Sequence, residues 1–268
     1  MDKIKTIIKK IFGVHEYSRY TPINDLISVG FMHGFYMIPD NFLSENSVCY
    51  CIGAGIDISF DTELVVMYNS KVFIFDPMPE GKNHYNALKE ALSHGKTLTV
   101  GADQLRPFNY RITKEEFDTI KYLELGIWDE STTVKFYEPT RENYASHSIL
   151  NLQKSDKFIE ANVDRISNIM KRFNHNSIDI IKIEIEGAEY RVIETIIEDK
   201  LNIKIILVEY DEIRNHKGFL YLWRIKRSTN LLLNAGYKMV YTNSKFKRTF
   251  IRNDVYDLLM FRDGKIQN

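Results

Sequence analysis

The sequence predicts an α/β fold in which a mostly parallel sheet carries helices on both faces and ends in an antiparallel hairpin. Strand-like runs rich in isoleucine and valine alternate with amphipathic, helix-like segments, a pattern typical of parallel sheets. Several of these runs are apolar almost throughout, as expected for strands that are buried on both faces. Two strand-like segments follow the last predicted helix with no helix between them, which indicates the hairpin.

The chain has 268 residues and no composition shift that would mark a linker, so we expect one globular domain overall. Residues 1–46 are predicted to form an N-terminal helix and a lead-in segment that covers the site, and residues 47–268 the domain that contains the sheet. Isoleucines recur at helical spacing among lysines near the N-terminus, which predicts a short basic amphipathic helix. We expect it to pack on the domain or on the second subunit of a homodimer, with membrane-surface binding as the alternative.

Basic and acidic residues are equal in number, 36 each, so no global positive field would attract nucleic acid. Cys49 and Cys51 lie two apart on a predicted strand, too close for an ordinary disulfide and without a second ligand pair for zinc. No apolar run approaches the roughly 20 residues that span a bilayer. These features predict a soluble, cytoplasmic protein without nucleic-acid partners or stable membrane insertion.

The first buried strand of the sheet is predicted over Val48–Ile52 and leads into Gly53, Ala54 and Gly55, after which a helix begins near Phe60. Glycines permit a tight turn and the close approach of a ligand to the backbone. Free N–H groups at the helix start favour an electron-rich group. The turn is therefore a candidate cofactor site.

A second buried strand, Lys71–Phe75, ends in Asp76 and Pro77 about 20 residues after the glycine turn. An acid at this spacing can accept hydrogen bonds from the two hydroxyls of a ribose. The turn and the acid together predict a cofactor that contains adenosine.

The middle of the chain is predicted to hold a helix over 82–92 and strands over 98–100, 117–125 and 132–137. Ile127 and Trp128 follow the third of these elements and are candidates to face an adenine, with core packing as the alternative. The polar loop 138–148 contains His147, which is a candidate site residue because the loop precedes an acidic strand. A plain surface histidine is the alternative.

The main candidate site lies at the end of the strand 178–185, where Glu184, Glu186 and Glu189 crowd around Gly187 before a helix over 188–199. The strand 203–209 also ends in acids, including Glu209 and Asp211. Parallel strands end at one edge of a sheet, and ligands bind outside that edge, so we expect a rim of carboxylates there. Alternatively, the glutamates only solvate a strand end and favour a helix N-terminus.

The remaining predicted elements are helices over 155–173 and 219–235 and final strands over 237–242 and 254–261. The loop 245–250 between the last strands is basic and contains Lys245, Lys247 and Arg248. It is a candidate site for a phosphorylated or nucleotide-linked ligand, with a solvated basic face as the alternative.

The run from Ile181 to Glu189, Ile-Lys-Ile-Glu-Ile-Glu-Gly-Ala-Glu, resembles the signature of the FkbM-type methyltransferases, which belong to the S-adenosylmethionine-dependent class I enzymes. The resemblance covers roughly residues 48–211. It implies a Rossmann-like class I methyltransferase fold with a seven-stranded sheet, with residues 47–268 as the catalytic domain.

The resemblance also implies cofactor contacts in this chain. It gives Gly53, Ala54 and Gly55 the role of the cofactor turn and Asp76 that of the ribose ligand, and we assign Pro77 and Glu186 to the same site. Two departures affect this reading, because Cys51 replaces an acid common at the end of the first strand and Asp57 replaces a glycine. We expect Asp57 to take over part of the contact to the amino-acid end of S-adenosylmethionine.

Since family members commonly methylate hydroxyls, the resemblance implies O-methylation of a sugar or sugar nucleotide, as in surface-polysaccharide or natural-product biosynthesis, with S-adenosylhomocysteine as the product. The candidates for the base that deprotonates the hydroxyl are Glu184, Glu209, Asp211 and His147. A Mg²⁺ ion on the clustered carboxylates is an alternative that we do not favour.

Two other functions stay open at this stage. A glycine turn followed by an acid also serves NAD-type oxidoreductases, but the third glycine of that motif would fall at Ile58. The other alternative is a methyltransferase-like module that binds a partner without catalysis.

Overall fold

The computed structural model describes residues 20–21, 23–31, 34–101, 107–139, 147–151, 154–210, 220–243 and 247–262. The predicted N-terminal helix lies outside these residues. In the part of the chain that is described, no helix combines the length and the apolar character needed to cross a bilayer.

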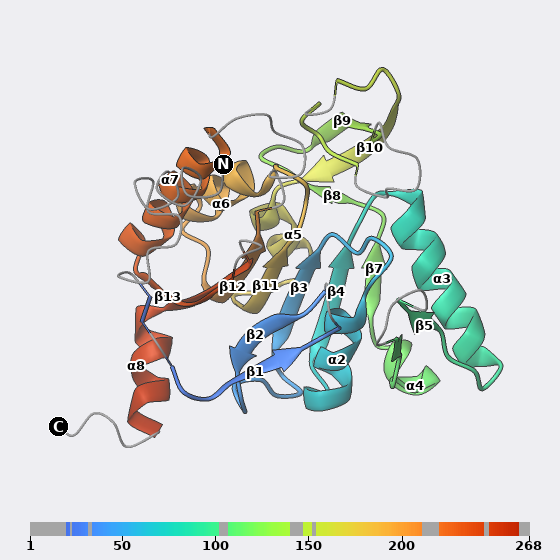
Figure 1. The fold of residues 1–268 in the computed structure, drawn as a ribbon, viewed down its shortest axis with the longest axis horizontal. Helices are drawn as coiled ribbons and strands as arrows, with labels where there is room; N and C mark the ends of the chain where they lie inside the picture. The colour runs from blue at the N-terminus through green and yellow to red at the C-terminus, as the bar shows by residue number, and fades with distance from the viewer. Residues whose placement is uncertain are drawn as a thin grey trace, which may run out of the picture.

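A seven-stranded sheet forms the centre of the molecule (Figure 1), with the strand order β13-β14-β12-β11-β3-β4-β7. Only β14 runs antiparallel to its neighbours, and every other adjacent pair is parallel. The strands are β3 (Val48–Ile52), β4 (Lys71–Phe75), β7 (Lys121–Leu123), β11 (Ile178–Ile183), β12 (Ile203–Glu209), β13 (Tyr237–Thr242) and β14 (Lys247–Arg252). This order confirms the predicted class I methyltransferase fold with its C-terminal antiparallel hairpin.

Each face of the sheet packs against its own hydrophobic cluster, because both faces of the central strands are apolar. Among the described residues, one face is covered by the two-stranded sheet β1–β2 and four helices, and the other face by three helices. The elements of the first face are β1 (Leu26–Val29), β2 (Tyr36–Pro39), α2 (Ser59–Tyr68), α3 (Pro79–Ser93), α4 (Lys114–Phe117) and α8 (Asn253–Arg262). Those of the second are α5 (Ile166–Arg172), α6 (Glu189–Glu198) and α7 (Leu220–Asn234).

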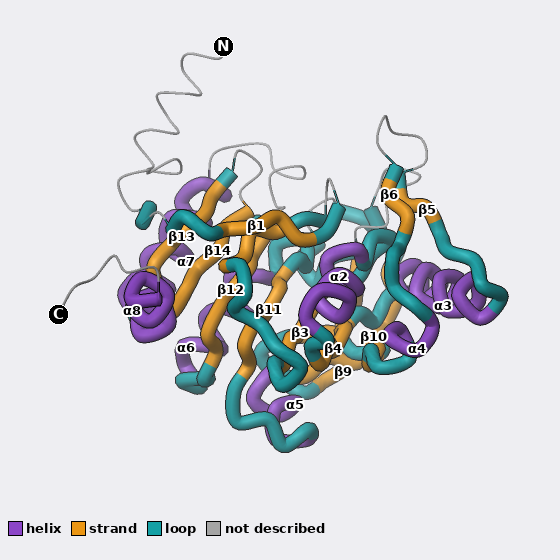
Figure 2. The backbone as a smooth tube through the Cα atoms, turned by 90° about the horizontal axis from the view of Figure 1, so that it is seen from below, coloured by secondary structure: helices purple, strands orange, loops and turns teal. Residues whose placement is uncertain are grey.

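Two small sheets extend the domain. The pair β5 (Thr99–Val100) and β6 (Phe108–Asn109) lies with α3 at the end of the molecule opposite α8 and β13 (Figure 2). The strands β8 (Gly126–Ile127), β10 (Phe158–Asp164) and β9 (Thr132–Tyr137) form a second sheet. Because β8 follows the end of β7 directly, this three-stranded sheet continues from the carboxyl edge of the central sheet.

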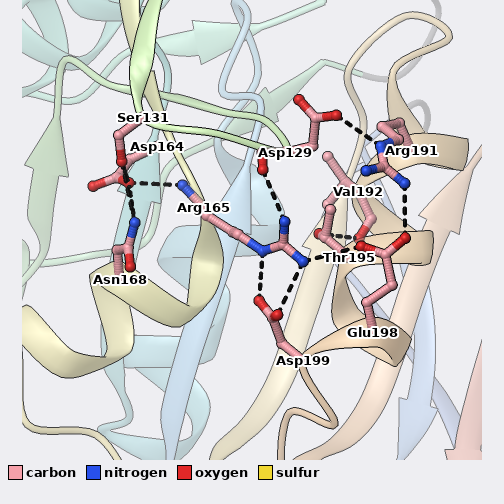
Figure 3. Close-up of polar contacts among 10 residues, drawn as sticks. All are labelled: Asp129, Ser131, Asp164, Arg165, Asn168, Arg191, Val192, Thr195, Glu198 and Asp199. Atoms are coloured by element: carbon pink, nitrogen blue, oxygen red, sulfur yellow. Dashed lines mark hydrogen bonds and ion pairs between the residues drawn. The ribbon is translucent and has the colours of Figure 1, made fainter.

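Ion pairs connect the three-stranded sheet to α6 (Figure 3). The guanidinium of Arg165 binds the Asp199 carboxylate through two nitrogens, at 2.6 and 2.9 Å, and also contacts Glu198. Arg191 in α6 binds Glu198 at 2.8 Å and Asp129, in the β8–β9 turn, at 2.7 Å. The cluster fixes the position of the small sheet beside the central one.

The predicted helix over 155–173 is wrong for its first half. Phe158–Asp164 is the strand β10, which pairs with β9 along six residues, and only Ile166–Arg172 is helical. Likewise, the predicted strand 117–125 is reduced to Lys121–Leu123, since Lys114–Phe117 forms the helix α4.

The C-terminal hairpin is present, but its second strand is not where the sequence predicted it. Lys247–Arg252, which we read as part of a basic loop, is the strand β14, and residues 254–261 belong to the helix α8. Within the lead-in segment, residues 26–39 contain an antiparallel pair of strands, β1 and β2, rather than irregular chain. Their core residues join the same hydrophobic cluster as α2.

Candidate functional site

The candidate site lies where the strand order of the sheet changes direction. From β3 the chain builds outward through β4 and β7, and it then returns to place β11 on the other side of β3. In open α/β sheets, ligands bind outside the carboxyl ends of the strands at such a point. Gly53 follows β3 and Glu184 follows β11, and the two strand ends are joined by a hydrogen bond from the Glu184 N–H to the Ile52 carbonyl, at 3.1 Å.

Gly53 requires its glycine for two reasons. Its φ is +88°, and a Cβ added to it would lie 2.1 Å from the carbonyl oxygen of Glu184. Gly55 also has a positive φ, +50°, but a Cβ there would meet nothing within 4 Å. The inner side of the turn is thus in contact with β11, while the turn remains open at Gly55 for a ligand to approach the backbone.

Asp76 holds the glycine turn against the end of β4. Its Oδ2 accepts the N–H groups of Ala54 (2.8 Å) and Gly55 (3.0 Å), and its Oδ1 accepts the N–H of Met78 (2.8 Å). Burial raises the pKa of this carboxyl, against the opposite effect of the three N–H donors. Because Oδ1 accepts one N–H bond, it retains acceptor capacity that suits a ligand hydroxyl.

Asp57 contacts the start of α2 and the segment between β1 and β2. Its Oδ1 accepts the N–H of Ser59 at 2.9 Å, and its Oδ2 would lie 2.9 Å from a Cβ on Gly34. Ser59 in turn accepts the N–H of Phe31 through its hydroxyl, at 2.7 Å. These contacts attach the β1–β2 pair to the helix that follows the glycine turn.

The other predicted cofactor residues lie on the β4 side of the edge. Pro77 is near Gly126, where an added Cβ would lie 3.4 Å from its Cγ. Ile127 is buried in the hydrophobic cluster beneath the sheet. Trp128 is half-buried and packs with Met78 in a third, smaller cluster. Trp128 is therefore partly accessible to a ligand, whereas Ile127 is not.

Glu184 and Glu209 come together on the β1–β2 side of the carboxyl edge, as the rim hypothesis required. Tyr36 in β2 donates its hydroxyl to Glu184 Oε2 at 3.1 Å. The ammonium of Lys247 lies 2.7 Å from Glu209 Oε2 and 3.9 Å from Glu184 Oε2. We call Tyr36, Glu184, Glu209 and Lys247 the acid-pair cluster.

The two carboxyls of the acid-pair cluster have opposite proton affinities. Burial, followed by the neighbouring Glu184 charge, raises the pKa of Glu209 to about 8. The pKa of Glu184 is lowered: burial acts to raise it, but Lys247, Lys182 and the hydrogen bonds from Glu209 and Tyr36 outweigh that effect. At neutral pH the two carboxyls therefore hold one proton as a pair.

The two other glutamates of the motif have different surroundings. Glu189 is fully buried and accepts the N–H groups of Ile185 (3.0 Å) and Gly187 (2.8 Å), so it closes the turn before α6. Glu186 is half-buried with a φ of +53°, and its carbonyl accepts the hydroxyl of Ser148 at 2.7 Å. Only Glu184 of the three belongs to the acid-pair cluster.

His147 contacts Glu80 and no residue of the acid-pair cluster among the contacts of the described residues. Its Nδ1 is 3.9 Å from Oε2 of Glu80, in the first turn of α3. Asp211 lies outside the described residues. Among the described residues, no group of three or more His, Cys, Asp and Glu side chains is arranged to hold a metal ion.

Sequence reasoning missed Tyr36 and the role of Lys247. The basic-loop hypothesis treated Lys247 and Arg248 as one anion-binding patch, and the structure contradicts it for these two residues. They are consecutive in a buried strand and point to opposite faces, Lys247 to Glu209 and Arg248 to Thr229 in α7. Lys247 could have been predicted from the sequence, because a buried acid at a strand end requires a cation nearby, and a lysine on the adjacent strand can supply it.

The fold and the site define a methyltransferase. The family model for the methyltransferase FkbM domain matches residues 52–239, so the chain belongs to the FkbM methyltransferase family. The match confirms the resemblance and continues past residue 211, where we expected the resemblance to end. A search of curated proteins found no match.

Solved structures with similarity to the chain include two proteins of low sequence identity. The fibrillarin pre-rRNA processing protein of Methanococcus jannaschii is 12% identical with a TM-score of 0.38, covering 78% of this chain and 68% of that one. The METTL16 methyltransferase domain is 10% identical with a TM-score of 0.38, covering 77% of this chain and 60% of that one.

Proposed function

We propose that the protein transfers a methyl group from S-adenosylmethionine to a hydroxyl of a small polyhydroxylated acceptor, a sugar or sugar nucleotide. The observation that carries the proposal is the contact between Gly53 and Glu184. The glycine turn and a carboxylate of the acid-pair cluster belong to adjoining strand ends, and the Glu184 carbonyl leaves no room for a Cβ on residue 53. A cofactor on the turn and an acceptor on the carboxylate would therefore be neighbours.

The residues of the turn fit an adenosine-containing cofactor. Gly55 leaves the turn open, and Asp76 holds the turn while Oδ1 keeps capacity for a ribose hydroxyl. We assign Asp57, Pro77, Trp128 and Glu186 to the surroundings of the same ligand, with Ile127 beneath them. When bound, S-adenosylmethionine supplies an electrophilic methyl group.

The chain's own contribution is to align and deprotonate the acceptor. Alignment of an oxygen for in-line displacement can supply roughly 7–11 kcal/mol of the barrier. Glu184 is the proposed proton acceptor, because its side chain is 32% exposed while those of Glu209 and Lys247 are 6% and 2% exposed. A positioned base of this kind contributes on the order of 10²–10⁴ in rate.

Carboxylates favour a sugar-like acceptor, because Asp and Glu oxygens accept hydrogen bonds from neighbouring hydroxyls. An NAD-dependent reaction is not favoured, since Ile58 fills the position of the third glycine and is fully buried in the core.

Calorimetry with S-adenosylmethionine, S-adenosylhomocysteine and NAD tests the cofactor. We expect binding of the first two and none of NAD, whereas the reverse result would refute the proposal. Transfer of an isotope-labelled methyl group to a panel of sugars and sugar nucleotides, with NMR of the product, then tests the acceptor and the methylated atom. A protein that binds the cofactor tightly but methylates nothing on a broad panel would favour the binding-module alternative.

A matched pair of variants links transfer to the site. Glu184→Gln should lower turnover by about 10²–10⁴ without loss of cofactor binding. Glu90→Gln, on the exposed side of α3, should leave turnover unchanged.

A further inference from the structure

Lys247 is brought to the carboxylates by the direction of its strand. β14 is antiparallel to β12, and Lys247 and Glu209 are register partners, so the first residue of β14 lies beside the last residue of β12. The ammonium is 2.7 Å from Glu209, 3.9 Å from Glu184 and 4.1 Å from the ring centroid of Tyr36. Tyr36, Glu209 and Lys247 belong to three different strands and are almost completely buried, and Glu184 directly follows a fourth strand, β11.

We propose that Lys247 and Tyr36 are positioning residues that hold Glu184 and Glu209 as a carboxyl pair with one shared proton, and that the Lys247 ammonium supplies the positive charge that a divalent cation would otherwise provide at this rim. The inference rests on the proposed function, because it names what poises the proposed base.

The charges around the pair support this role. Two carboxylates in contact do not both ionise cheaply when buried, and a single ammonium compensates one negative charge. The second nearby cation, Lys182, already pairs with Asp61 of α2 at 3.0 Å, and Glu189 is held by backbone N–H groups. Lys247 is thus the cation that is directed at both members of the pair.

Tyr36 orients the carboxyl of Glu184. Its hydroxyl donates to the same Oε2 that faces Lys247, so both contacts act on one oxygen of Glu184. In the proposed step, the acceptor hydroxyl would give its proton to Glu184 as its oxygen bonds to the methyl carbon. The methyl–sulfur bond would break with its electron pair on the sulfur, which leaves neutral S-adenosylhomocysteine. Glu209 keeps its own proton, so that each carboxyl then carries one, and the added proton leaves to solvent with the product.

The first test measures the titration of the two carboxyls and does not depend on methyl transfer. In the cofactor-free full-length protein, ¹³C NMR of labelled glutamate follows the carboxyl titrations, with Glu209→Gln and Glu184→Gln providing the assignments. Lys247→Met should move the Glu209 midpoint upward by about 1–3 pH units, and Lys247→Arg should restore most of the shift. Tyr36→Phe should move the Glu184 midpoint upward by a smaller amount.

Matched controls separate this effect from a loss of stability. Lys204→Met removes another strand lysine that pairs with a carboxylate, Asp179 at 2.7 Å, and Tyr237→Phe removes a buried tyrosine hydroxyl that binds the Ile203 carbonyl at 2.8 Å. Both sites lie toward the amino ends of their strands, and neither variant should move the midpoints. If Lys247→Met does not fold, Tyr36→Phe, which keeps the ring, still decides the point.

The second test uses turnover. The part of the pH profile of kcat/KM that reports ionisation of the pair should shift in Lys247→Met by the same number of pH units as the NMR midpoint. On that part of the profile, one pH unit corresponds to about a tenfold change in kcat/KM. Chelator should leave wild-type turnover unchanged, and loss of turnover that Mg²⁺ restores would overturn the proposal. Unmoved midpoints in both Lys247→Met and Tyr36→Phe would also overturn it, even in an active methyltransferase. Failure to bind S-adenosylmethionine would instead refute the proposed function and leave the titration result standing.

Discussion

Glu209 and Lys247 are register partners in the antiparallel pairing of β12 with β14, and their charged ends lie 2.7 Å apart. A parallel strand at this position would present its carboxyl end at the site edge, whereas β14 presents its first residue there. The C-terminal hairpin therefore contributes a side chain to the site in addition to closing the sheet. Glu209 and Lys247 are both buried, and removal of either one would leave the other in the core without its partner.

Glu209→Gln should flatten the pH dependence of stability. The folded-state pKa of Glu209 is about 8 against an ordinary value of 4.5. The folded protein thus binds more protons than the unfolded chain between these values, and stability is lost as the pH rises through that window. The slope from one such group reaches at most about 1.4 kcal/mol per pH unit. Urea unfolding between pH 5 and 8 should show this loss in the wild type and a smaller one in the variant.

The free energy of unfolding of the variant is subtracted from that of the wild type at each pH. Contributions of the histidines, which both proteins contain, then cancel. Glu90→Gln, in which an exposed glutamate is changed, should follow the wild-type curve. Parallel curves for the wild type and Glu209→Gln would show that Glu209 titrates normally.

Asp76→Ala should weaken both the glycine turn and cofactor binding. The carboxylate accepts three backbone N–H bonds, and each hydrogen bond contributes about 0.5–1.5 kcal/mol, so we expect a loss of about 1.5–4.5 kcal/mol in the free energy of unfolding. Calorimetry with S-adenosylhomocysteine should show weaker binding in the same variant. Asp164→Ala is the matched control, because it removes a buried carboxylate that binds Ser131 and Asn168 away from the turn. It should cost stability but leave cofactor affinity intact, and an unchanged affinity in folded Asp76→Ala would reject the assignment.

Gly53→Ala should be far more damaging than another glycine-to-alanine change at positive φ. The left-handed backbone alone costs a non-glycine residue about 1–2 kcal/mol, and the added Cβ would lie 2.1 Å from the Glu184 carbonyl oxygen. Gly95, with a φ of +67° and nothing within 4 Å of an added Cβ, isolates the backbone term. We expect Gly95→Ala to show only that cost in urea unfolding, and Gly53→Ala to lose more stability and most cofactor affinity. Equal losses in the two variants would mean that the two strand ends separate easily.

The buried strands were predictable because burial on both faces leaves a simple signal. In β11, for example, every residue is buried, and its run of isoleucines allows no other element of that length. The same logic predicted the edge on which Gly53, Asp76, Glu184 and Glu209 lie, since strand ends and turn residues are visible in the sequence. Their partners were not predictable, because Tyr36 reaches Glu184 from a strand far away along the chain.

The wrong elements have identifiable causes. Ile159, Val163 and Ile166 recur at helical spacing, but the first two belong to β10, in which burial alternates from Phe158 to Val163. Residues four apart lie on one face of a strand as well as of a helix, so the spacing of Ile159 and Val163 fits both elements. Residues 254–261 read as a strand, yet Val255, Tyr256 and Leu259 are the buried residues and lie on one side of the helix α8. β14 was read as a loop because hydropathy does not show that Lys247 and Arg248 have partners inside the protein.

The buried ion pair between Lys182 and Asp61 accounts for one departure from the family pattern. Lys182 is the lysine of the signature, and its register partner on β3 is Cys51, where the resemblance led us to expect an acid. Asp61 of α2 supplies a carboxylate to Lys182 instead, at 3.0 Å, with both side chains at 3% exposure or less.

The single substitution Lys182→Met should therefore destabilise the protein more than replacement of both Lys182 and Asp61. Removal of one partner leaves an uncompensated buried charge, which costs about 3–5 kcal/mol, whereas replacement of both partners by apolar side chains is often close to neutral. We expect Lys182→Met and Asp61→Leu each to lower the free energy of unfolding strongly, and the double variant to recover most of that loss, as measured by urea unfolding at pH 7. Additive losses in the double variant would show that the two residues act through separate contacts, and that Asp61 does not replace the missing strand acid.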